Sequence, residues 1–168
     1  MDKTAEKLGL EIVGSTEFVE VAGVKNIPAK IDTGADSSSI WASDIDMEED
    51  GTLIFSLFDK QSPFYTGNRL KTTDYKAKDI RSSNGNKQIR YRVMLPIKLN
   101  NKTFTAAFTL ANRSKNHFPV LIGRRALEGN FLVDVRKMSV PRKVPHSSTH
   151  LNQELQENPY EFHQKYVK

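Results

Sequence analysis

The residues of this chain best suited to chemistry are the consecutive Asp32, Thr33 and Gly34. Apolar residues alternate with others in the segment 27–31 just before them, which is typical of a half-buried strand. Asp32 therefore stands at the end of a strand, where Gly34 allows the chain to turn sharply. Two carboxylates held in this way and brought face to face would share one proton, so that one acts as a base on water and the other as an acid on a carbonyl. The same three residues also form an ordinary structural turn, so a second signal is needed.

That second signal lies about ninety residues downstream, in the segment 118–127. Its apolar residues end at Gly123 and Arg124, and a short helix is expected directly afterwards. By itself this segment indicates only a buried strand followed by a helix. Found together with the Asp-Thr-Gly run, and in this order, it makes a catalytic interpretation far more specific.

The segment from Asp32 to Ser37 closely resembles the active-site motif of retropepsin-like aspartic proteases, and the segment 118–127 resembles the second hallmark of that family. The segments 81–85 and 129–134 resemble a narrower group, the bacterial retropepsin-like proteins labelled ATP-dependent zinc proteases. Some members of that group are associated with ATP-grasp enzymes that add glutamates to proteins. The resemblance implies an all-β, barrel-like acid-protease fold with one catalytic aspartate per chain.

The resemblance also implies roles for the residues of the first motif. Asp32 corresponds to the catalytic carboxylate, Thr33 supports the dyad through its hydroxyl, and Gly34 offers its backbone to the substrate. The chain holds a single Asp-Thr-Gly run. The second carboxylate must therefore come from another copy of the chain, and we expect a two-fold homodimer that cleaves peptide bonds.

Four further residues beside the turn receive roles in the same way. Ala35 and Asp36 are expected to line the substrate cleft. Gly123 and Arg124 match the structural brace of the family, in which the arginine pairs with the second aspartate of the motif. We therefore predict an ion pair between Arg124 and Asp36. Arg125 departs from the usual Gly-Arg-Asn pattern, so the local packing there is left open.

Residues 69–92 form the most basic stretch, with eight lysines and arginines against two aspartates. Asn84 and Gly85 predict the tight turn of a hairpin over residues 79–93. In retropepsins a mobile hairpin, the flap, lies between the two motifs and closes over the substrate. If this hairpin is the flap, an acidic or glutamate-rich peptide is the expected substrate. The alternative is an exposed edge hairpin whose cations discourage aggregation. The flap residues expected to contact substrate are Arg81, Ser82, Ser83, Asn84 and Gly85.

The remaining pattern predicts strands separated by turns and one short helix, which indicates an all-β barrel. The expected strands cover residues 18–24, 53–58, 93–99, 103–110 and 131–135, the helix covers 124–128, and an acidic turn covers 44–51. We expect a flexible N-terminus over residues 1–7, the retropepsin-like domain over 8–140, and a tail over 141–168 that is partly helical or disordered.

Composition limits the partners and cofactors. The chain has 168 residues, a net charge of +5 and no cysteine, which favours an acidic partner and excludes disulfides and a thiolate nucleophile. His146 and His150 alone have ligand-like spacing, and they lie in the tail, so we expect no metal site. No Gly-rich phosphate loop is present, and we expect no cofactor. The N-terminus shows no signal pattern and no apolar run approaches membrane-spanning length, so we expect a cytoplasmic protein without membrane contacts.

A rival interpretation from another class is a non-catalytic module that binds acidic peptides with its basic hairpin. Tyr75 and Tyr91 on a basic surface would also suit single-stranded nucleic acid. No recognisable nucleic-acid motif accompanies them, so nucleic acid ranks behind peptide.

Overall fold

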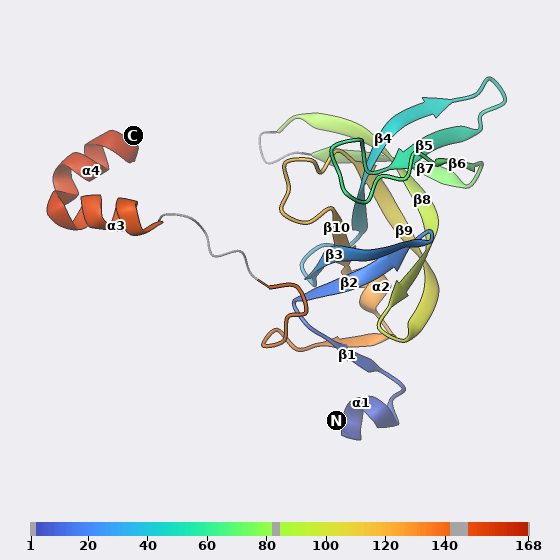
Figure 1. Cartoon of the computed structure of the whole chain (residues 1–168), viewed down its shortest axis with the longest axis horizontal. Helices are drawn as coiled ribbons and strands as arrows, with labels where there is room; N and C mark the ends of the chain where they lie inside the picture. The colour runs from blue at the N-terminus through green and yellow to red at the C-terminus, as the bar shows by residue number, and fades with distance from the viewer. Residues whose placement is uncertain (1–2, 82–84, 142–147, 168) are drawn as a thin grey trace.

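The computed structural model describes residues 3–81, 85–141 and 148–167. Close to half of these residues form strands, and the longer strands roll into a barrel, with short helices near the chain ends and beside the last barrel strand (Figure 1). The strands are β1 (Glu11–Val13), β2 (Thr16–Val21), β3 (Val24–Asp32), β4 (Ser38–Met47), β5 (Leu53–Leu57), β6 (Arg69–Thr72), β7 (Tyr75–Arg81), β8 (Lys87–Leu99), β9 (Lys102–Ala111), β10 (Val120–Gly123) and β11 (Phe131–Val133). The helices are α1 (Lys3–Lys7), α2 (Arg124–Leu127), α3 (Ser148–Glu157) and α4 (Pro159–Tyr166).

Six strands close the barrel in the order β10, β3, β2, β8, β9 and β4, because β4 also pairs with β10. Sequence neighbours pair as antiparallel hairpins, such as β2 with β3 and β8 with β9. The pairs β3–β10 and β4–β9 are parallel and join segments far apart in the chain. This arrangement confirms the all-β barrel expected from the sequence.

The barrel core is built from alternate residues of its strands. In β8, Val93, Leu95 and Ile97 are buried, whereas Met94 and Lys98 on the opposite face are exposed. Successive side chains of a strand point to opposite faces, so this alternation turns one apolar face inward. Burial of that face supplies the main favourable contribution to folding.

Several elements differ from the sequence expectation. The strand expected over residues 18–24 ends at Val21, because the chain turns at Ala22 and Gly23, both with positive φ, before β3 begins. The helix α1 forms where a flexible N-terminus was expected, and its Ala5 is buried. The strand β4 continues to Met47, into the segment expected to be an acidic turn; the chain reverses instead around Gly51, whose φ is +84°. The strand β6 was not expected; it extends the sheet by pairing with β5. The extension of β4 and the formation of β6 both depend on pairing with β5, which a local pattern does not report.

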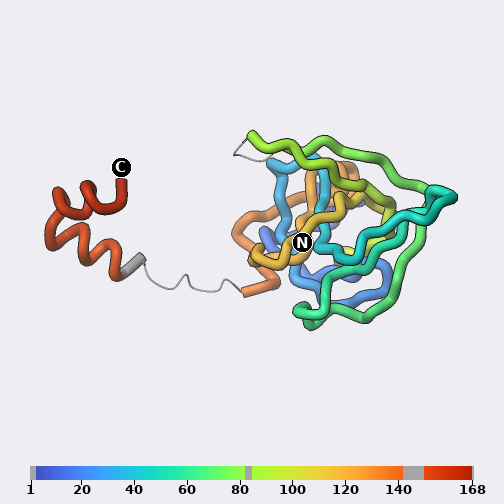
Figure 2. Tube along the Cα trace, turned by 90° about the horizontal axis from the view of Figure 1, so that it is seen from above, coloured from blue at the N-terminus to red at the C-terminus, as the bar shows by residue number. Residues whose placement is uncertain are grey.

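The C-terminal helices α3 and α4 pack against each other, and Lys165 and Tyr166 donate hydrogen bonds to Glu154. Both views of the chain show this pair of helices beside the barrel and apart from it (Figures 1 and 2). The hydrogen bond from Lys165, and next that from Tyr166, lowers the pKa of Glu154 from its ordinary value. In the described part of the tail, residues 148–157 and 159–166 are helical.

Candidate active site

The Asp32 carboxylate lies at the end of β3, inside a turn that is folded around it. The backbone N–H of Gly34 donates to Oδ1 of Asp32 at 3.0 Å, and the N–H of Ala35 donates to the Asp32 carbonyl at 3.3 Å. The Asp32 side chain remains 30% exposed. A carboxylate oriented by its own turn and open to solvent is available to act on a bound water.

The junction of β10 and α2 holds this turn from the other side. Gly123 lies opposite Asp32 in the parallel pair of β10 and β3. Its N–H donates to Oγ of Ser38 at 3.0 Å, and the N–H of Arg124 donates to the Ala35 carbonyl at 2.7 Å. The two segments expected to pack together are therefore joined by their backbones.

Glycine is required at position 123 because the two backbones are so close. A Cβ atom there would lie 2.5 Å from the carbonyl carbon of Ser37 and 2.9 Å from the carbonyl oxygen of Ala35. Ordinary Cβ contacts begin near 3.4 Å, so any side chain would push the turn away from β10.

The predicted ion pair between Arg124 and Asp36 is confirmed: Nη2 of the arginine donates to Oδ1 of the aspartate. The arginine and aspartate side chains are 61% and 59% exposed, so the pair contributes little to stability. Its effect is positional, because it ties Arg124 at the start of α2 to Asp36, which follows the turn at Asp32.

Lys30 is a neighbour of the carboxylate that the sequence reasoning missed. Its Nζ lies 4.0 Å from Oδ2 of Asp32, and its side chain is 53% exposed. Residues two apart on a strand share a face, so the spacing of Lys30 and Asp32 was a usable signal. The Asp32 carboxylate therefore has a solvent-facing cation beside it.

The basic hairpin is formed by β7 and β8, which pair from Tyr75 opposite Val93 to Arg81 opposite Lys87. Gly85 has a φ of +78°, which suits the predicted turn. Ser82, Ser83 and Asn84 lie outside the described residues. Arg81 is exposed, and within the described part of the chain no hydrogen bond or ion pair joins Arg81 or Gly85 to the catalytic turn. The substrate-binding role of this hairpin therefore stays a prediction.

Thr33 is exposed. It lines a pocket of about 270 Å³ together with Arg124, Leu127, Phe131 and others. Its predicted role in the dyad depends on a second chain and stays a prediction. Ala35 is partly buried and its carbonyl accepts the bond from Arg124, so its predicted contact with substrate is likewise untested.

Over residues 3–81, 85–141 and 148–167, no group of three histidine, aspartate or glutamate residues is placed to hold a metal ion. The described residues also include no helix that is long and apolar enough to cross a membrane.

A closed barrel with an Asp-Thr-Gly turn at a strand end, braced by a Gly-Arg junction, defines the retropepsin-like class of fold and site. The model of the family described as "RimB-like: Retropepsin-like aspartic endopeptidase RimB" matches residues 12–143. The chain belongs to this RimB-like family.

Curated relatives carry a different name. The chain is 30% identical over 135 residues to a probable alpha-L-glutamate ligase of Desulfotalea psychrophila, a match that covers 77% of this chain and 29% of the relative. It is 32% identical over 128 residues to a probable alpha-L-glutamate ligase of Shewanella pealeana, covering 73% of this chain and 28% of the relative. The chain thus spans less than a third of the length of these relatives.

A solved structure supports the fold. The crystal structure of a Legionella pneumophila protein of unknown function superposes with a TM-score of 0.55 at 28% identity. The superposition covers 76% of this chain and 95% of the Legionella chain.

Proposed function

We propose that this protein is an aspartic endopeptidase that works as a homodimer and cleaves acidic, glutamate-rich peptides. The observation that carries the proposal is the Asp32 carboxylate, oriented by the N–H of Gly34 at the end of a barrel strand. The description of the matching family as aspartic endopeptidases supports it.

In this proposal the Asp32 carboxylates of two chains meet across a two-fold axis and hold one proton between them, because two ionised carboxylates in contact repel each other. The ionised carboxylate takes a proton from a water molecule as the water oxygen attacks the peptide carbonyl carbon. The protonated carboxyl gives its proton to the carbonyl oxygen. The tetrahedral diol then collapses, the C–N bond breaks, and the amine leaves with a proton from the dyad.

The substrate class follows from the charge near the site. Lys30 lies 4.0 Å from the Asp32 carboxylate, and the hairpin of β7 and β8 is rich in lysine and arginine. Cations placed this way attract an acidic chain and raise its rate of association. The curated relatives are named glutamate ligases, and a peptidase for glutamate-rich chains would act on glutamate-containing products.

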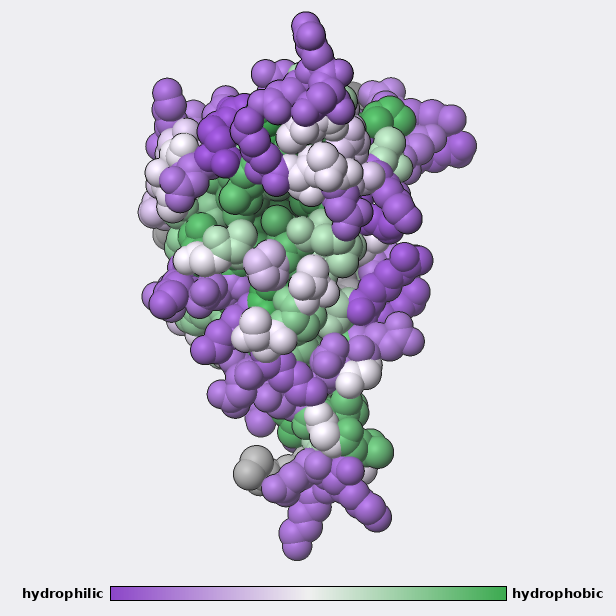
Figure 3. Space-filling view, turned by 90° about the vertical axis from the view of Figure 1, so that its right-hand side faces the viewer, coloured by the Kyte–Doolittle hydropathy of each residue, from purple (hydrophilic) through white to green (hydrophobic). Residues whose placement is uncertain are grey.

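A dimer also needs an apolar contact surface, and the barrel offers candidates. One face of the molecule has an apolar middle and a hydrophilic rim (Figure 3). Large apolar side chains, among them Phe18, Met94 and Leu132, are at least 39% exposed. Exposed apolar surface of this kind marks sites of protein association.

The test combines hydrolysis with the state of assembly. Decaglutamate is incubated with the wild-type chain and with Asp32→Asn, and products are identified by mass spectrometry. The wild type is expected to cleave the peptide as a dimer, and Asp32→Asn is expected to lose hydrolysis while it still binds. Asp44→Asn makes the same chemical change at an exposed residue of β4 and serves as the control.

A peptide-binding module remains the second candidate, because the chain matches only a section of relatives named as ligases. The same experiment separates the two functions. Binding of decaglutamate without Asp32-dependent hydrolysis, in a chain that ultracentrifugation shows to be a monomer, would refute the peptidase and leave the binder.

A further inference from the structure

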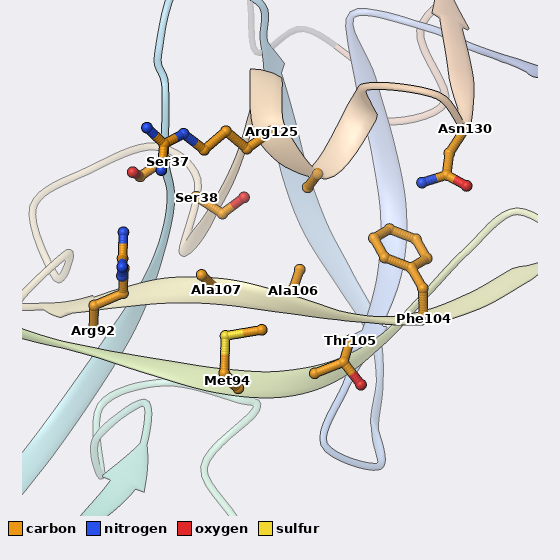
Figure 4. A pocket seen from close by; sticks show the side chains of 11 residues that line it. Ser37, Ser38, Arg92, Met94, Phe104, Thr105, Ala106, Ala107, Arg125 and Asn130 are labelled. Atoms are coloured by element: carbon orange, nitrogen blue, oxygen red, sulfur yellow. The ribbon is translucent and has the colours of Figure 1, made fainter. Parts of the chain in front are cut away.

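A pocket separate from the Asp32 carboxylate lies between α2 and the outer face of the β8–β9 hairpin. It has a volume of about 320 Å³, at the lower end of the range for ligand pockets. Arg92 of β8 and Arg125 of α2 line one end of it, together with Ser37. Figure 4 shows the two arginine side chains converging beside Ser37, while Phe104 and Asn130 lie at the other end.

The two arginines of this pocket carry uncompensated charge. Among the described residues, neither guanidinium has a hydrogen-bond or ion-pair partner, and the residues that line the pocket include no carboxylate. Arg125 is held in place by its backbone, whose N–H donates to the Asp36 carbonyl at 3.2 Å. Two like charges held together in a concavity favour an anion, and guanidinium groups match the geometry of a carboxylate.

Apolar side chains form much of the rest of the pocket wall, beside the uncharged polar Ser38, Thr105 and Asn130. Met94, Phe104 and three alanines line it, and they would contact an aliphatic stem. A glutamate side chain combines both features, since two methylene groups precede its carboxylate. A bare inorganic anion would use only the arginine end.

Arg92 also continues a row of cations along β8. Arg90 lies two residues earlier on the same face, and its guanidinium donates to Oε1 of Gln88 at 2.8 Å, which leaves its charge in place. Residues two apart on a strand are separated by about 6.8 Å, which is also the repeat of same-face side chains in an extended peptide. Arg113 lies near this row: burial, and then the charge of Arg90, lowers its pKa from the ordinary value. The spacing suits alternate glutamates of an extended chain.

We propose that this pocket is an exosite that binds a glutamate side chain of the substrate. The proposal rests on the proposed function for its substrate, and it predicts that long glutamate-rich chains bind better than short ones. Ser37 follows directly after Asp36, so the occupied pocket would also lie against the catalytic turn.

The test measures binding first, because binding does not require catalysis. Fluorescein-labelled decaglutamate is titrated with the Asp32→Asn protein and with two double variants, in which Arg92→Gln or Arg125→Gln is combined with Asp32→Asn. Fluorescence anisotropy measures the binding. Each added substitution is expected to weaken binding about tenfold, which corresponds to the loss of one charge-assisted contact. Lys98→Gln removes a cation from the same face of β8 away from the pocket, and we expect unchanged binding.

Competition and hydrolysis complete the test. Free glutamate is expected to displace the labelled peptide at lower concentration than inorganic phosphate, and phosphate displacing it better would overturn the carboxylate assignment. In the catalytically intact chain, the ratio of the KM for decaglutamate to that for triglutamate is expected to rise with Arg92→Gln and Arg125→Gln.

The failures of the two proposals are distinguishable. If neither Arg92→Gln nor Arg125→Gln weakens the binding of decaglutamate, the exosite is overturned, even if Asp32-dependent hydrolysis is present. Arginine-dependent binding without hydrolysis supports the pocket and refutes the peptidase.

Discussion

Replacement of Gly123 by alanine tests whether the contact between β10 and the catalytic turn controls activity. The added Cβ would lie 2.5 Å from the carbonyl carbon of Ser37, so the backbones must separate by about 0.9 Å to reach ordinary contact. Overpacking of this kind costs about 1–3 kcal/mol. For a chain of this size, we expect the Tm to fall by roughly 2–12 °C.

The same displacement moves the Asp32 turn, because Gly123 lies opposite Asp32 in the β3–β10 register. A misplacement of about 1 Å at a reacting group costs on the order of 100-fold in rate. We therefore expect kcat/KM for decaglutamate to fall by one to two orders of magnitude at 25 °C. Circular dichroism gives the Tm, and a peptide-cleavage assay gives the rate.

Gly14→Ala is the matched control. Its added Cβ would lie 2.5 Å from the carbonyl oxygen of Lys137, where β1 meets the segment after β11. It should lower the Tm by a similar amount. At temperatures well below that Tm, the rate of cleavage should stay near the wild-type rate. Equal loss of activity in both variants would refute a specific coupling, and an unchanged Tm in Gly123→Ala would refute the close approach.

Three further predictions concern an ion pair, a buried hydroxyl and a titrating carboxylate. Arg124→Gln should change the free energy of unfolding by less than about 1 kcal/mol, because the pair of Arg124 with Asp36 is exposed. The same substitution should lower kcat/KM. A large fall in Tm without an effect on the rate would contradict this prediction. Ser56→Ala should leave the Tm unchanged or raise it, because within the described residues the buried Ser56 hydroxyl has no hydrogen-bond partner; a lower Tm would show that it does have one. The side-chain hydrogen bond from Arg136, and next its backbone N–H, lowers the pKa of Asp134 from 3.8 to about 2. The stabilisation from Asp134 is therefore present above about pH 4 and is lost as the pH falls toward 2. Asp134→Asn should flatten the dependence of Tm on pH in that window. An unaltered profile would contradict a lowered pKa of Asp134.

Much of the fold was predictable because strand and turn patterns are local. The alternation before Asp32, the buried alternate residues of 93–99 and the Asn-Gly turn each depend on neighbours in sequence, and the structure has strands or a hairpin at each place. The helix after Gly123 was expected from the local pattern, whereas the pair between Arg124 and Asp36 followed from resemblance to a family, and both are present.

Other features depended on which distant strands meet. The sequence contains no local signal that β4 pairs with β10 to close the barrel, or that α1 buries Ala5. The proximity of Lys30 to Asp32 was readable from a spacing of two on a strand, but its relevance appears only once the carboxylate is seen to face solvent.

The sequence by itself determined the turn at Asp32, the basic hairpin and the alternation of the core, because backbone preference and hydrophobic period act over a few residues. The tertiary structure alone brought Arg92 and Arg125 to one pocket and set how closely Gly123 approaches Ser37. Those positions are set by the closure of the barrel, in which parallel pairing joins segments that local sequence cannot match to each other.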